Sequence, residues 1–281
     1  MKKNNGSYLA YPYVIWSAIF IVVPLLLVVF FGFTKLQGGA YIFSLENFTK
    51  ILSEGAYIKI FVRSISLALK STLICLILGY PVSYIISKMD INKRSTVIML
   101  FILPMWMNFL LRTYAWAALL GNNGIINIFI TSLGFEPVKI LYTDVAVLLG
   151  MVYNFLPFMV LPIYTVLSKM DENLINAAKD LGANNIQVFI KVIFPLSLPG
   201  VVSGITMVFM PAVSTFIISK LLGGGQFMLL GNLIEQQFMV TGDKNFGSAV
   251  SIFMMIIILI TMAIMSRFDG EDDKEGGGLL F

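Results

Sequence analysis

Six long apolar stretches separated by polar connections dominate the pattern of this chain. They cover residues 11–34, 63–87, 97–120, 144–167, 200–222 and 247–266. Each has the roughly 20 residues that an α-helix needs to cross the hydrocarbon core of a bilayer. Helices are the expected form because they satisfy every backbone polar group internally. The pattern predicts an all-α integral membrane protein with six transmembrane helices in one domain, 1–268.

The polar stretches between these spans are predicted to be connections. Residues 35–62 are polar and contain glycine, and they are expected to form a loop. Residues 168–199 form the longest polar segment and are expected to lie outside the bilayer. The acidic, glycine-rich residues 269–281 are predicted to form a flexible tail.

Composition agrees with a membrane protein and excludes several kinds of chemistry. Of the 281 residues, 58% are hydrophobic and 12% are charged. Histidine is absent, and Cys75, the single cysteine, lies within an apolar stretch. Zinc sites of the Cys/His type, disulfides and Ser–His or Cys–His catalysis are therefore excluded within this chain, and no metal is expected. The net charge of +4 is spread over the connections, so it is not a nucleic-acid signature, and no nucleic-acid partner is expected. Membrane lipid is the expected environment.

The distribution of basic residues predicts the orientation in the membrane. With the N-terminus inside, the inner segments hold ten lysines and arginines and the outer loops hold five. Because cytoplasmic loops carry an excess of such residues, both termini and the segment 168–199 are predicted to be cytoplasmic. The expected location is the bacterial cytoplasmic membrane.

The segment 168–199 reads as two short helices joined by a tight turn. Asp171 can cap the first helix. The helical spacing of Leu174, Ala177, Ala178 and Leu181 predicts a narrow apolar face along it.

Gly182 stands where a helix commonly ends with a left-handed residue. Asn184 or Asn185 can cap the second helix, and we expect Pro195 and Pro199 to end it before the next apolar stretch.

This segment resembles the coupling loop of ABC importer permeases, the inner-membrane components of binding-protein-dependent transport. Ala177, Ala178, Gly182 and Pro195 match the family pattern in register, while Asn176 replaces its glutamate. The resemblance implies the six-helix type I (MetI-like) permease fold. It assigns ATPase coupling to a set that also includes Ala183: Ala177, Ala178, Gly182, Ala183 and Pro195.

The resemblance also implies a transporter subunit that is not itself an enzyme. No glycine-rich phosphate loop of the G-x-x-x-x-G-K-S/T kind is present in the sequence. No cofactor is therefore expected in this chain, and ATP and Mg²⁺ are expected on a separate ATPase, present in two copies.

Two further stretches are similar to the polyamine branch of these permeases, specifically to the first permease subunit of spermidine/putrescine importers. They are SKLLGGGQFMLLGNLIEQQF at 219–238 and ILPMWMNFLLRTYAW at 102–116. This similarity implies polyamine import together with a second, homologous permease subunit and an extracytoplasmic polyamine-binding protein.

A polycation path calls for carboxylates and aromatic faces. No acidic residue lies in the middle of a predicted span, so deep carboxylates would come from the second permease. The path candidates in this chain are Trp106, Asn108, Tyr114, Trp116, Tyr153, Asn154 and Glu235. The aromatic residues among them fit helix packing or an interfacial belt equally well. Arg112 is expected to pair with an acid of a partner or to cap carbonyls. Lys70 is expected to snorkel towards the interface, or to face a neighbouring helix or a polar path.

Two other functions stay open from the residues alone. One is an ABC importer permease for another small solute. The other is a secondary transporter driven by an ion gradient, which the lack of mid-span acids disfavours.

Overall fold

The computed structural model describes residues 11–267, so the predicted tail 269–281 lies outside the described residues. The described chain forms two compact units. The first contains the residues up to Ile60 together with Leu233–Ile256. The second contains Phe61–Asn232 and the residues from Ile257 on.

The first unit begins with a long apolar helix. It consists of α1 (Tyr11–Ser17), the π-helical turn η2 (Ala18–Val22) and α2 (Val23–Gly32). Pro24 lies directly after the π-helical turn, in the first turn of α2. Gly32 is buried, and a Cβ there would meet the side chain of Ile252 at 2.4 Å. This glycine therefore sets how closely α2 approaches α14.

The prediction that residues 35–62 form a loop is wrong, because most of them lie in strands or helices. Strands β1 (Thr34–Gln37) and β2 (Ala40–Phe43) pair antiparallel. Gly38 and Gly39 have φ of +60° and +85°, as a two-residue hairpin turn of this twist requires. Helix α3 (Glu46–Ser53) follows, and α4 already begins at Gly55.

The remaining elements of the first unit close it against this hairpin. The end of α13 (Leu230–Gln236) leads through η4 (Gln237–Thr241) into α14 (Lys244–Met265). The Asn245 amide donates to the carbonyl oxygens of Phe31 and Thr34, at 3.0 and 2.6 Å. The start of α14 is thereby fixed to the end of α2.

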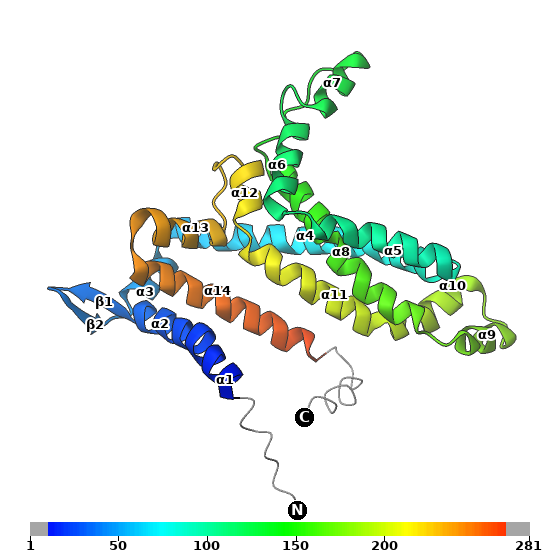
Figure 1. The fold of residues 1–281 in the computed structure, drawn as a ribbon, viewed down its shortest axis with the longest axis horizontal. Helices are drawn as coiled ribbons and strands as arrows, with labels where there is room; N and C mark the ends of the chain where they lie inside the picture. The colour runs from blue at the N-terminus through cyan, green and yellow to red at the C-terminus, as the bar shows by residue number, and fades with distance from the viewer. Residues whose placement is uncertain (1–10, 268–281) are drawn as a thin grey trace, which may run out of the picture. The chain divides into compact units, whose positions relative to one another are not determined.

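Three long helices form the core of the second unit: α4 (Gly55–Ser87), α8 (Asp144–Ser168) and α11 (Phe194–Ser214). Figure 1 draws α8 and α11 side by side. A Cβ at Gly200 of α11 would lie 2.9 Å from the carbonyl oxygen of Pro162. Small residues at such positions let helix backbones approach closely, as is common in membrane proteins.

The third predicted span, 97–120, is broken in the structure. Helices α5 (Ile91–Trp106) and α6 (Phe109–Leu120) replace it, and the α5–α6 pair bends by 93° at the break. Asn108 causes the restart because its Oδ1 accepts hydrogen bonds from the amides of Leu110 and Leu111, at 2.8 and 3.4 Å. A short helix, α7 (Ile125–Ser132), follows.

The fifth predicted span, 200–222, is also broken. Helix α11 ends at Ser214, and α12 (Ile217–Leu222) begins after Thr215, whose backbone is extended. Within residues 11–267, five helices are long and apolar enough to cross a membrane, and the bent α5–α6 pair makes a sixth if it counts as one span.

Candidate functional site

The first helix of the predicted coupling loop is α9 (Glu172–Asp180). The Asp171 side chain accepts a hydrogen bond from the Asn173 amide at 2.9 Å, which confirms it as the N-cap. Glu172 lies in the first turn, where a negative charge is favourable at the positive end of the helix dipole.

Gly182 ends α9 in the way that the sequence predicts. Its φ is +86°, in the left-handed region that glycine adopts without strain. The Gly182 amide donates to the Lys179 carbonyl at 2.8 Å, and the Ala183 amide donates to the Ala178 carbonyl at 3.1 Å. These two bonds form a Schellman motif, which satisfies carbonyls that the helix end leaves open.

The second helix of the loop begins as expected but does not end as expected. Asn184 and Gln187 form a reciprocal capping box, so Asn184 is the cap of α10 (Asn185–Val188). The π-helical turn η3 (Phe189–Ile193) leads directly into α11. Helix geometry therefore runs to Ser214, and the prediction that prolines stop it is wrong.

The position of the prolines explains this continuity. Pro195 is among the first residues of α11, directly after the wider η3 turn, where the ladder of i→i−4 hydrogen bonds is already interrupted. The Ser197 hydroxyl donates to the Phe194 carbonyl at 2.8 Å, a local back-bond within the first turn of α11. The loop is thereby continuous with α11, a long apolar helix.

Helices α9 and α10 form a helical hairpin, whose outer apolar face has no partner in the described chain. Leu174, Leu181 and Ile186 are 48%, 89% and 70% exposed. Ala177 is exposed, and Ala178 is half-buried. The inner side holds Ile175 and Val188, which are 8% and 2% exposed. We call the outer set, Leu174, Ala177, Leu181 and Ile186, the coupling face.

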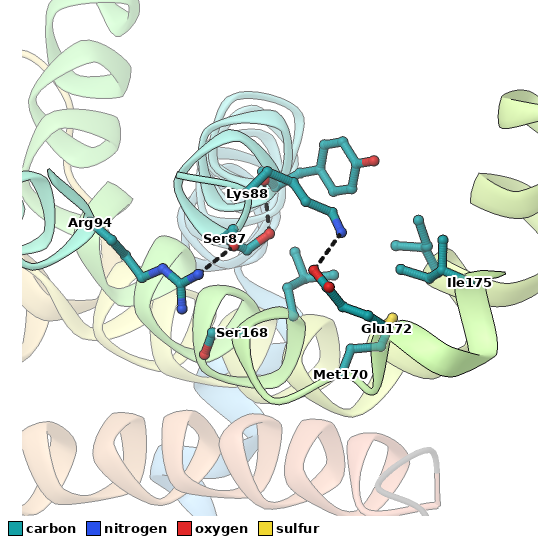
Figure 2. A pocket seen from close by; sticks show the side chains of 10 residues that line it. Ser87, Lys88, Arg94, Ser168, Met170, Glu172 and Ile175 are labelled. Atoms are coloured by element: carbon teal, nitrogen blue, oxygen red, sulfur yellow. Dashed lines mark hydrogen bonds and ion pairs between the residues drawn. The ribbon is translucent and has the colours of Figure 1, made fainter. Parts of the chain in front are cut away.

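A cavity of about 180 Å³ lies behind the root of this hairpin (Figure 2). On one side the Arg94 guanidinium donates to the carbonyls of Ser87 and Met89, at 3.0 and 3.3 Å. On the other side the Lys88 ammonium lies 4.0 Å from the Glu172 carboxylate. Arg94 thus caps the carboxyl end of α4, and Lys88 links that end to α9.

Sequence reasoning missed both contacts at this cavity. Basic residues just beyond a helix are a signal for capping of its last carbonyls, and Lys88, Lys93 and Arg94 follow α4. The pairing of Lys88 with Glu172 has no local signal because it joins residues far apart in the chain.

The predicted path residues lie on several separate elements. Trp106, at the end of α5, is 79% exposed, and Tyr114, on α6, is 55% exposed. Asn108 is used as the cap of α6. Glu235 belongs to α13 in the first unit.

Two of the predicted path residues do meet. The rings of Trp116 and Tyr153 lie edge to face with centroids 5.2 Å apart. They line an apolar groove of about 340 Å³. Asn154 is 2% exposed, and its amide donates to the Gly150 carbonyl at 2.8 Å. Its Oδ1 has no partner within the described chain, so Asn154 is a buried polar group of α8 and does not line an open path here.

Arg112 and Lys70 differ in their surroundings. Arg112 is 8% exposed, and its guanidinium carbon lies 5.9 Å from the Phe109 ring centroid. Its Nε has no hydrogen-bond partner in the part of the chain that the structure describes. Lys70 is exposed on α4. The role predicted for Arg112 stays a prediction.

The glycine-rich stretch after α12 is closed by Asn232. Its amide donates to the Phe216 carbonyl at 3.0 Å, and its Oδ1 accepts from the Leu229 amide at 3.2 Å and from the Ser219 hydroxyl. Gly224, with φ of +61°, lies against the ring of Tyr142. These contacts hold residues 223–229 between α12 and α13.

The fold, with the helical hairpin of α9 and α10 between two long apolar helices, is that of a class of membrane transport protein. Residues 4–270 match the family described as the binding-protein-dependent transport system inner membrane component. The match covers most of the sequence, so the chain belongs to this family.

Curated relatives carry a more specific name. The chain is 37% identical over 257 residues to the spermidine/putrescine transport system permease protein PotB of Haemophilus influenzae, covering 90% of each chain. It is 36% identical to PotB of Escherichia coli, with 90% of this chain and 93% of the relative covered. These relatives are permease subunits of transporters.

Solved structures agree on the fold. A bacterial alginate ABC transporter, solved with an alginate-bound periplasmic protein, matches with a TM-score of 0.80 at 14% identity, covering 94% of this chain and 93% of the other. The MetNI methionine ABC transporter in an inward-facing conformation matches with a TM-score of 0.53 at 17% identity, covering 75% and 93%. The chain therefore has the ABC importer permease fold expected from its sequence.

Proposed function

We propose that this chain is the first permease subunit of an ATP-driven importer of polyamines such as spermidine and putrescine. The observation that carries this proposal is the similarity to PotB proteins, which covers about nine-tenths of both chains. Together with a second, homologous permease, the chain forms the translocation path. An extracytoplasmic binding protein delivers the polyamine to it.

The coupling face supports the proposed link to an ATPase. Leu174 and Leu181 are exposed on either side of the small Ala177 and form an apolar surface. Because Ala177 is small, a partner can approach the helix backbone closely, and the hairpin can seat in a groove of that partner. The hairpin continues into α11 without a break in helix geometry, so a push on it is transmitted along a rigid element. In the proposed mechanism, closure of two ATPase subunits around ATP and Mg²⁺ moves this hairpin and rocks the bundle between two states.

The proposal includes an orientation. The hairpin and both termini lie in the cytoplasm, in agreement with the excess of basic residues on that side. The opposite end of α8, at Asp144, then faces the outside, because α8 is about 37 Å long for its 25 residues.

Reconstitution of the complete importer tests the proposal. The chain is co-expressed with its ATPase, second permease and binding protein and placed in liposomes. We expect ATP hydrolysis and uptake of labelled spermidine or putrescine to rise with polyamine-loaded binding protein. Hydrolysis that responds to a different solute would overturn the polyamine assignment. Uptake that continues without ATP, under an ion gradient, would overturn the ATP-driven mechanism.

A further inference from the structure

Three side chains meet at the end of the second unit that lies opposite the coupling hairpin along α8. Arg63 of α4 donates through Nη2 to the Asp144 carboxylate at 2.5 Å. The guanidinium carbon of Arg63 lies 4.0 Å from the centroid of the Phe227 ring. Phe227 belongs to the segment 223–229 that follows α12.

This cluster is open to solvent. The side chains of Arg63 and Asp144 are 34% and 53% exposed. The carboxylate and the aromatic face therefore hold a cation at a place that a solute can reach. An exposed ion pair of this kind contributes little to stability, so another cation can compete with it.

A carboxylate beside an aromatic face is the combination that recognises an alkylammonium group. The carboxylate accepts charge-assisted hydrogen bonds from the N–H groups, and the ring attracts the cation through its quadrupole. A guanidinium and a primary ammonium both satisfy these two partners. Arg63 thus occupies a position whose chemistry suits the end of a polyamine.

We propose that Asp144 and Phe227 form an alkylammonium-binding site in which Arg63 is the internal occupant, and that the terminal ammonium of a polyamine displaces Arg63 there. The site rests on the proposed function, since the polyamine is the solute of that importer. It adds a substrate contact outside the set predicted from the sequence.

Displacement of Arg63 has a structural consequence. Arg63 links α4 to the start of α8 and to the segment 223–229 through Phe227. Besides the Asn232 hydrogen bonds, two backbone donors tie that segment and its ends to neighbouring elements. The Leu230 amide donates to the Ser64 hydroxyl, and the Tyr142 amide donates to the Leu222 carbonyl, both at 2.8 Å. Binding of an ammonium group therefore removes the tie that Arg63 makes while the others remain, so it loosens this end without unfolding it.

The test measures spermidine binding to the complete importer in nanodiscs, without the binding protein. Asp144→Asn removes the charge that both cations need, so we expect the Kd for spermidine to rise at least about tenfold. Arg63→Ala removes the competitor, so we expect the Kd to fall about threefold or more. The opposite signs separate a binding site from a purely structural ion pair, whose two single variants would act in the same direction.

A matched ion pair provides the control. Lys35 and Glu46 form an exposed pair at 2.6 Å in the first unit, with side chains 45% and 61% exposed. Glu46→Gln is expected to leave the Kd unchanged. Phe227→Leu keeps an apolar side chain but removes the ring face, so it is expected to raise the Kd about threefold. This variant decides the matter if the charge variants do not assemble.

The outcomes separate the site from the importer function. The site is overturned if the Kd moves in the same direction for Asp144→Asn and Arg63→Ala. It is also overturned if Asp144→Asn or Phe227→Leu binds spermidine with the wild-type Kd. A wild-type importer that takes up spermidine from its binding protein but binds none without it also overturns the site and leaves the function standing. An importer that ignores polyamines in uptake and hydrolysis overturns the proposed function itself.

Discussion

Replacement of Gly182 by alanine isolates the contribution of one backbone conformation to the coupling hairpin. Gly182 has φ of +86°, and a Cβ built there has no atom within 4 Å. An alanine side chain therefore causes no clash with neighbours. Its effect comes from the left-handed backbone alone, and that backbone positions the two hydrogen bonds that close α9.

The expected magnitude follows from that conformation. A left-handed backbone costs an L-residue with a Cβ roughly 1–2 kcal/mol, whereas asparagine tolerates it better than other residues. A change of this size lowers the ratio of closed to open hairpin by a factor of about 5–30. Gly182→Asn is the matched control because it adds a larger side chain with a smaller backbone penalty.

Hydrogen exchange of the peptide that contains Ala183 measures this opening directly in the assembled importer. We expect exchange to be fastest in Gly182→Ala, intermediate in Gly182→Asn and slowest in the wild type. Uptake per ATP hydrolysed should fall in the same order. If alanine exchanged as slowly as glycine, the argument from backbone conformation would be refuted. A greater loss for asparagine than for alanine would point instead to side-chain bulk at the turn between α9 and α10.

Three further changes test packing, hydrogen bonding and charge. Gly200→Ala places a Cβ 2.9 Å from the backbone of α8, so thermal denaturation should show destabilisation of about 1–3 kcal/mol. Ser64→Ala leaves the buried Leu230 amide without its acceptor, and the same assay should show a loss of about 1–3 kcal/mol. Glu172→Gln removes the loose contact with Lys88, and the melting temperature should barely move because an exposed pair is worth about 0–1 kcal/mol.

A glycine with free space serves as the control for the packing prediction. Gly55 begins α4, and no atom lies within 4 Å of a Cβ built there. Gly55→Ala should leave the melting temperature unchanged or raise it slightly, since alanine favours helix. A melting temperature for Gly200→Ala that matches that of Gly55→Ala would contradict the close approach of α8 and α11.

Local hydrogen bonding made the caps of the coupling hairpin predictable. Asp171, Gly182 and Asn184 act on backbone groups within five residues of themselves, so the sequence alone carries the signal. The same locality should have revealed the hairpin at Gly38 and Gly39, because two glycines between short apolar stretches favour a tight turn.

Two features of the spans were not predictable from hydropathy: where a helix continues through prolines, and where a polar side chain starts a new helix. The prolines near the start of α11 are helix breakers by composition, yet the chain passes through the π-helical turn η3 into α11 without leaving helical geometry. Asn108 divides the third span because its side chain caps a new helix inside an apolar stretch. Hydropathy does not register either event, since it counts apolar residues and ignores hydrogen bonds.

The sequence by itself determined the class of this protein: apolar stretches of bilayer length require helices, and the capping residues around Gly182 predict the helical hairpin between two of them. Only the tertiary structure decided which side chains meet. Trp116 reaches Tyr153, and Arg63 reaches Asp144 across 81 positions. Such pairs depend on the packing of separate helices, for which a single sequence carries no periodic signal.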